Sequence, residues 1–212
     1  MTDDLIATRR ALHGVAENVL AGAQYRQSGT IRLVITPGGF GTISDPALRI
    51  AGTELIAGER AIPVNGTTCG GLGTTTDIEA GAPQGLYEEG SGVQLDDVLS
   101  VDAGAAAYLE ECFERGDAAL RRFAPDLTPV LWPEHFDLGI TLDEVNYGVS
   151  PGDGYLDEPY AYAGPWRQRS GSFWNTPFGA ARPLRDLSGP NSIHDFLTEA
   201  RVRAASAPLI NP

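Results

Sequence analysis

Apolar residues recur at helical spacing in three segments of the chain. In residues 3–25 they lie three or four positions apart, which predicts an amphipathic helix with Thr2 or Asp3 as its cap. The stripe consists of Leu5, Leu12, Ala16, Val19, Leu20 and Ala23. Residues 102–123 show the same spacing with Asp102 as N-cap, and residues 190–205 predict a short C-terminal helix.

Alternating apolar and polar residues predict strands elsewhere. The clearest stretches are residues 30–36 (TIRLVIT), 129–142 and 158–166. In residues 47–66, glycines break the pattern into two or three short strands. Residues 67–92 are rich in Gly and Thr and lack a helical period, so they predict either short strands or a long loop.

The order of these elements predicts the fold class. Strands come in runs and do not alternate singly with helices, which is typical of an α+β protein with a mostly antiparallel sheet. A barrel-like closure of that sheet stays open as an alternative. We therefore predict a single domain over residues 1–212, with an N-terminal helix, a central helix and a short C-terminal helix. A chain of 212 residues can bury a full core without disulfides or metal ions.

The stretch LWPEHFDLGI (131–140) combines strand alternation with chemically active side chains. If one strand runs through it, His135 and Asp137 project from the same face. In that arrangement Asp137 would orient His135 as a general base, so both are candidate catalytic residues. Glu134 would share the other face with Trp132, where a carboxylate needs a partner. Pro133 indicates an edge strand or a bulge.

An acidic, aromatic-rich window surrounds this stretch. From residue 123 to 166 there are eight acids and no Arg, namely Asp126, Glu134, Asp137, Asp143, Glu144, Asp153, Asp157 and Glu158. Such acids form a solvated rim, pair with arginines from elsewhere, or line a site. The window and the residues after it also hold Trp132, Phe136, Tyr147, Tyr155, Tyr160, Tyr162, Trp166, Phe173, Trp174 and Phe178. We predict a ligand site from Trp132, Glu134, Asn146, Tyr147, Tyr160 and Tyr162.

The charge balance excludes some partners. The formal net charge is −13, from 28 acids and 15 bases, and every base is Arg because the chain contains no Lys. A chain this acidic repels phosphate backbones and anionic lipids, so we expect neither a nucleic-acid nor a membrane partner. The sequence favours no particular oligomeric state.

The two cysteines and the chain's hydropathy suggest a reducing compartment. Cys69 and Cys112 form no disulfide framework and no zinc-finger spacing. No apolar run has the length of a membrane span, and the acidic N-terminus does not resemble a signal peptide. We therefore expect a cytoplasmic protein with reduced thiols. Cys112 falls within the apolar stripe of the central helix, which favours a buried structural thiol.

Several short stretches resemble functional motifs but lack a group that the function of the motif requires. TPGGFGT (36–42) is no phosphate loop, because that loop needs a Lys. GVSPG (148–152) places Pro151 where a nucleophile elbow needs a backbone N–H for its oxyanion hole. No metal motif is present, and we expect neither a metal nor a cofactor.

Parts of the chain resemble an uncharacterised bacterial family of actinobacterial type, a domain of unknown function. The resemblance rests on an F-W-x-x-F-D-L-x-x-T strand, a D-E-P-x-x-Y-x-Y-x-x-P segment and an earlier G-x-I-R-L strand. The matching residues are Trp132, Phe136, Asp137, Leu138, Thr141, Asp157, Glu158, Pro159, Tyr162, Gly29, Ile31, Arg32 and Leu33. The PEH segment and the spacing depart from the pattern. No activity is established for the family, so the resemblance implies a shared architecture and no chemistry.

Two functions follow from these patterns. The first is the binding of a small molecule in an aromatic- and acid-lined pocket near His135, with hydrolase or isomerase chemistry as an extension. The alternative is a non-catalytic structural or interaction module that presents its acidic loop to a protein partner. The chain carries no motif that decides whether it is an enzyme.

Overall fold

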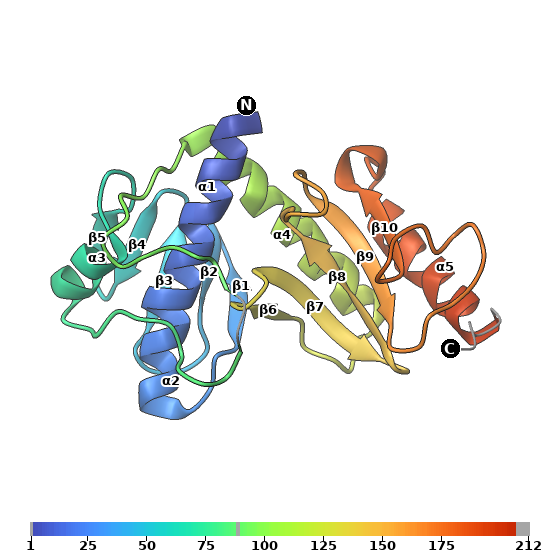
Figure 1. Cartoon of the computed structure of the whole chain (residues 1–212), viewed down its shortest axis with the longest axis horizontal. Coiled ribbons are helices and arrows are strands. Elements are labelled where there is room, and N and C mark those ends of the chain that lie inside the picture. The colour runs from blue at the N-terminus through green and yellow to red at the C-terminus, as the bar shows by residue number, and fades with distance from the viewer. Residues whose placement is uncertain (1, 88–89, 207–212) are drawn as a thin grey trace. The chain divides into compact units, whose positions relative to one another are not determined.

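The structure is a computed structural model that describes residues 2–87 and 90–206 (Figure 1). Its internal contacts divide the chain into two compact units. Unit 1 comprises Met1–Glu111 and Val130–Phe136, and unit 2 comprises Cys112–Pro129 and Asp137–Pro212. The single domain over residues 1–212 stays a prediction.

Unit 1 is a long helix packed on an antiparallel sheet. The helix runs through α1 (Thr2–Val15), the π-helical segment η1 (Ala16–Ala21) and α2 (Gly22–Ser28). The strands lie in the order β6, β1, β2, β3, β4, β5, with bounds Val130–Trp132, Leu33–Thr36, Gly39–Thr42, Leu48–Ala51, Glu54–Ala57 and Arg60–Pro63. Figure 1 shows the helix crossing the face of this sheet, and η1 contacts β1 and β2. The core between them includes Val19, Leu20, Leu33, Phe40 and Ile50.

The predicted N-terminal helix is confirmed, but it contains a π-helical segment. Within η1 the Gly22 N–H bonds to the Glu17 carbonyl, five residues back instead of four. Gly81 N donates to Asn18 O at 2.7 Å, so a carbonyl in the widened turn bonds outside the helix. The helix is buried on all sides from Gly14 to Gln24. The sheet covers one side, and residues from 78–87 and 90–93, which we call the covering segment, contact the other.

The segment predicted as short strands or a loop contains a helix, α3 (Cys69–Thr76). Thr68 caps it by accepting from Gly71 N at 2.9 Å. Its glycines permit close packing, because a Cβ on Gly73 would lie 2.9 Å from Ala80 Cβ and from Ile78 O. For residues 69–76 the prediction was wrong, because tertiary packing outweighs the poor helix propensity of Gly and Thr. Cys69 is fully buried there, and burial raises the pKa of its thiol to about 12, which disfavours the thiolate that a nucleophile needs.

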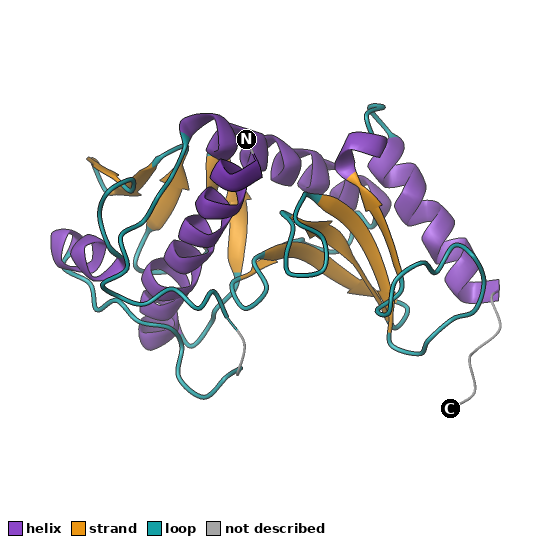
Figure 2. Ribbon diagram, turned by 45° about the horizontal axis from the view of Figure 1, so that its top comes forward, coloured by secondary structure: helices purple, strands orange, loops and turns teal. Residues whose placement is uncertain are grey.

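Unit 2 is a four-stranded antiparallel sheet with helices on one face. Its strands lie in the order β7 (Asp137–Leu142), β8 (Val145–Ser150), β9 (Tyr160–Pro165) and β10 (Ala180–Pro183). Helix α4 (Ala103–Phe123) enters the unit at Cys112, and η2 (Leu184–Asp186) and α5 (Ser192–Ser206) follow β10. Figure 2 shows these helices beside the strands. At Gly116 of α4 a Cβ would come within 2.9 Å of Val149 on β8, so this helix lies close against the sheet.

The α+β class with a mostly antiparallel sheet is confirmed. The central helix begins as predicted, since Asp102 Oδ1 accepts from Ala105 N at 2.8 Å. The region 47–66 forms three strands, β3 to β5, and residues 158–166 contain β9. Among the described residues no pairing joins the outer strands of either unit, so neither set of strands closes in a barrel-like manner.

The single strand predicted through residues 129–142 is wrong. β6 ends at Trp132, residues 133–136 form a turn, and β7 begins at Asp137. Phe136 adopts a φ of 54°, a left-handed conformation that is rare for a bulky residue. The turn interrupts the alternation, so the inference that His135 and Asp137 project from one strand face no longer follows.

Candidate functional site

The side of β7–β9 opposite the unit 2 helices carries a row of polar side chains. The register pairs Gly139 with Gly148 and Gly148 with Tyr162, and paired residues share a face. Alternation along each strand extends this face, which we call the tyrosine face: Asp137, Thr141, Asn146, Ser150, Tyr160, Tyr162 and, just beyond β9, Trp166. Four residues predicted for the site therefore share a face, namely Asp137, Asn146, Tyr160 and Tyr162.

Tyr162 lies across two glycines to reach Asp137. A Cβ on Gly148 would lie 2.6 Å from Tyr162 Oη, and one on Gly139 would lie 2.8 Å from it. The ring thus occupies space that side chains on these strands would otherwise fill, and its hydroxyl donates to Asp137 Oδ2. Burial, followed by the charge of Asp137, raises the pKa of Tyr162 well above its usual value. Tyr162 is therefore a protonated hydrogen-bond donor at neutral pH.

A second Tyr–Asp pair closes the buried end of the tyrosine face. Tyr160 donates to Asp153 Oδ2, while Asp153 Oδ1 accepts from the backbone N–H groups of Tyr155 and Leu156 at 2.8 and 3.0 Å. Burial and the contact with Asp153 raise the pKa of Tyr160 above its usual value. Because Asp153 already accepts three hydrogen bonds, its role here is to hold the loop that follows β8.

The exposed end of the tyrosine face is built around Asn146. Its Oδ1 accepts from Thr141 Oγ1 at 2.8 Å and from the Trp166 indole N–H at 3.3 Å. The Trp166 backbone N–H also donates to Glu144 O at 2.9 Å. Asp143 and Glu144 both have positive φ values, 53° and 59°, as a tight two-residue hairpin turn requires. The hairpin between β7 and β8 thus positions Trp166 beside Asn146.

Tyr147, also predicted as a ligand residue, lies on the other face of the sheet. It is fully buried, and its ring centroid is 4.9 Å from that of Phe123 on α4. Burial raises the pKa of its hydroxyl to about 12. Among the described residues, no hydrogen-bond partner reaches that hydroxyl. Tyr147 is therefore part of the core and cannot contact a ligand on the tyrosine face.

The remaining predicted residues belong to unit 1. Trp132 lies in β6 with the Arg32 guanidinium 5.9 Å from its ring centroid. His135 is exposed in the turn, with its Nε2 3.8 Å from a Glu134 carboxylate oxygen. The catalytic role assigned to His135 and Asp137 stays a prediction. The partner of His135 is Glu134, whereas Asp137 accepts a hydrogen bond from Tyr162.

A histidine that was not among the predicted site residues, His13, stabilises the turn at residues 133–136. His13 of α1 donates from Nε2 to the Pro133 carbonyl at 2.8 Å, which fixes its tautomer. Its ring stacks on Phe136 with 5.3 Å between centroids, and Phe40 meets Phe136 edge-on. Burial lowers the pKa of His13, although the Pro133 hydrogen bond and the charge of Glu17 oppose the shift.

We predict a loss of stability on acidification that depends on His13. The unfolded chain binds a proton near pH 6.5, whereas the folded form does so only at lower pH, so the free energy of unfolding should fall as the pH drops below 6.5. Urea denaturation between pH 7.5 and 5 measures this slope. His13→Gln keeps a side-chain N–H for Pro133 and does not titrate, so its slope should be shallower. Equal slopes would contradict the assignment.

Glu17 on η1 is a buried carboxylate with a structural role. Its Oε2 accepts from Ser91 N at 2.9 Å and from Ser91 Oγ at 2.6 Å. A Cβ on Gly90 would lie 2.1 Å from Glu17 Oε1, so the covering backbone leaves no room for a ligand. Burial and the charge of Glu17 raise the pKa of Tyr87 nearby. Glu17 therefore anchors the covering segment to the helix.

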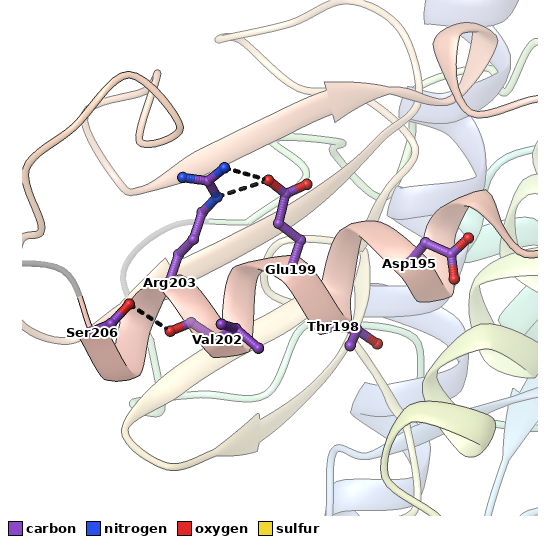
Figure 3. A pocket seen from close by; sticks show the side chains of 6 residues that line it. All are labelled: Asp195, Thr198, Glu199, Val202, Arg203 and Ser206. Carbon is purple, nitrogen blue, oxygen red and sulfur yellow. Dashed lines mark hydrogen bonds and ion pairs between the residues drawn. The ribbon is translucent and has the colours of Figure 1, made fainter.

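A groove along α5 has fewer features of a ligand site than the tyrosine face has. It is lined by one side of the helix alone, and Figure 3 shows Arg203 paired with Glu199 and Ser206 Oγ bonded to Val202 O. Because these groups satisfy one another within one helix, the groove lacks converging polar groups from a second element.

Residues 2–87 and 90–206 contain neither a metal-binding cluster nor a helix suited to a bilayer. No three His, Cys, Asp or Glu side chains gather there as a metal ion would require. No helix in these residues combines the length and apolar character that a bilayer span needs.

Comparison with known proteins found no matching family model, no similar curated protein and no similar solved structure. The chemistry of the tyrosine face is therefore the main guide to function.

Sequence reasoning missed three residues of this face, Thr141, Ser150 and Trp166, and also Asp153, the loop residue that accepts a hydrogen bond from Tyr160. Trp166 was counted among the aromatic residues but was not assigned to the site. Its place two residues beyond Gly164 on the same alternating strand was the signal available. Asp153 stands in a Gly-rich loop, and its partners became visible only in the structure.

Proposed function

We propose that the protein binds a small organic molecule on the tyrosine face of unit 2. The observation that carries this proposal is the hydrogen-bonded polar row from Asp137 to Trp166, which has exposed aromatic side chains at both ends. At one end stands Trp166, and at the other Tyr155 packs edge-on against Phe178 with 5.3 Å between centroids. Aromatic surfaces beside a few oriented polar groups are typical of ligand sites.

The arrangement also favours binding over structure alone. A polar sheet face needs no hydrogen bonds between its side chains, because water can satisfy each one. Here Thr141, Asn146 and Trp166 are held in one geometry, and Tyr162 is held on Asp137. Such preorganisation reduces the entropy that a ligand must overcome on binding.

The experiment is a fragment screen by protein-observed NMR, with amide shifts of Asp137, Asn146 and Tyr162 as the readout. Tyr162→Phe keeps the ring over the glycines and removes the hydroxyl from Asp137, so we expect at least several-fold weaker binding of any fragment that shifts these amides. The matched control is Tyr147→Phe on the buried face, which should leave affinity unchanged. A library that shifts no residue of the tyrosine face would refute the proposal.

A further inference from the structure

We propose that the ligand of the tyrosine face is a neutral polyhydroxylated molecule, such as a sugar, stacked on Trp166 and hydrogen-bonded to Asn146. This inference rests on the proposed function and names its ligand class. It draws on the exposure of Trp166, the orientation of the Asn146 amide and the charge of the surroundings.

Trp166 presents a large, oriented apolar surface to solvent. It is 65% exposed, although its backbone N–H and its indole N–H both make hydrogen bonds. An exposed indole held by its polar edge offers a flat ring to a partner that has both apolar and polar groups. A sugar ring has this character, because its C–H groups can pack on the indole while its hydroxyls reach the neighbouring polar side chains.

The Asn146 amide orientation follows from its neighbours. An indole N–H can only donate, so the atom of Asn146 that meets Trp166 must be the carbonyl oxygen. That oxygen also accepts from Thr141 Oγ1, which leaves the Asn146 NH₂ group as the donor on the open side. No hydrogen bond joins this NH₂ to another residue in the described parts of the chain. It can donate two hydrogen bonds to hydroxyl oxygens beside the indole.

Charge argues against an anionic ligand. The tyrosine face contains no Arg, and several arginines of unit 2 pair with acids outside this face, among them Arg201 with Asp143, Arg185 with Glu158 and Arg203 with Glu199. With a net charge of −13, a phosphate or carboxylate would meet net repulsion, and the exposed Arg167 beside Trp166 is the nearest cation in sequence. Hydroxyl groups suit a face that offers amide donors and carboxylate and hydroxyl acceptors.

The experiment titrates the intact chain with four classes of probe and follows amide shifts and tryptophan fluorescence. The probes are maltotriose, cellotriose and xylotriose as sugars, spermidine as a cation, inorganic phosphate as an anion and indole as a flat apolar compound. We expect at least one sugar to shift Asn146, Trp166 and Tyr162. Trp166→Ala should weaken that sugar at least about tenfold, since it removes the stacking surface. The matched control is Val202→Ala on α5, which is 64% exposed and should bind normally.

The outcomes separate the ligand class from the proposed function. If spermidine, phosphate or indole shifts the tyrosine face and no sugar does, the sugar inference is overturned while small-molecule binding on this face stands. Equal sugar affinity in Trp166→Ala and wild type overturns the inference as well. If neither these probes nor the fragment library shifts the face, both proposals fail.

Discussion

Replacing Gly148 with alanine is expected to destabilise unit 2 by about 3 kcal/mol or more. The added Cβ would lie 2.3 Å from the Leu138 carbonyl oxygen and 2.6 Å from Tyr162 Cζ. The carbonyl belongs to the neighbouring strand β7 and cannot move without breaking the ladder, and Tyr162 is held by Asp137. Overpacking at a fixed backbone is among the few mechanisms that produce losses of this size.

Urea denaturation followed by circular dichroism measures the loss as a lower midpoint. The matched control is Gly154→Ala in the loop after β8, because a Cβ there meets nothing within 4 Å and its φ is not left-handed. That variant should change the free energy of unfolding by no more than about 0.5 kcal/mol. A Gly148→Ala variant with the wild-type midpoint would show that Tyr162 does not lie against the glycine.

Replacing Gly22 with alanine is also expected to destabilise the protein by about 3 kcal/mol, against the trend of helix propensity. In an exposed helix this change stabilises by about 1 kcal/mol. Here the Cβ would lie 1.8 Å from the Gly81 carbonyl oxygen. The clash falls where Gly81 bonds to Asn18 and where Arg26 donates to Gly81 O at 3.1 Å, so the covering segment must detach or the helix must shift.

Thermal unfolding and limited proteolysis test this second variant together. We expect a lower melting temperature and faster cleavage within residues 78–87. Gly104→Ala is the matched helical control, since Gly104 is exposed in α4 and its Cβ would meet only Asp102 Oδ1, at 3.2 Å. It should stay within about 1 kcal/mol of wild type. A Gly22→Ala protein that melts at a higher temperature would disprove the close contact.

Periodicity predicted the elements of the fold where local pattern and packing agree. The stripes of the N-terminal and central helices and the runs of short strands all appear in the structure. It failed at α3 and in the turn at residues 133–136, where distant residues decide the conformation. Helix α3 has poor helix propensity, but Gly73 lets the backbone near Ala80 pack closely against it. The rings of His13 and Phe40 contact Phe136, which has a positive φ. No local pattern reports either contact.

Several residues of the predicted site lie on one face of the sheet, for a reason that lies in the strands. Asn146, Tyr160 and Tyr162 share a face because alternation and register bring them there. Asn146 and Tyr147 are consecutive in β8, so a strand must send them to opposite faces. A stricter use of alternation would have excluded Tyr147 from the sequence alone. The turn before Asp137 interrupts the alternation on which the assignment of Glu134 and His135 to that face depended, and only the structure shows it.

The π-helical segment fixes the rotational phase of the N-terminal helix. A regular α-helix turns by about 100° per residue, so one extra residue in η1 rotates all preceding side chains by about that angle. With this offset Arg10 reaches Asp97 at 2.8 Å and His13 reaches Pro133, while Asn18 bonds to Gly81. Deleting one residue within Ala16–Ala21 would restore regular geometry and turn Arg10 and His13 away from their partners. The irregular turn is thus what lets one helix satisfy two differently oriented sets of contacts.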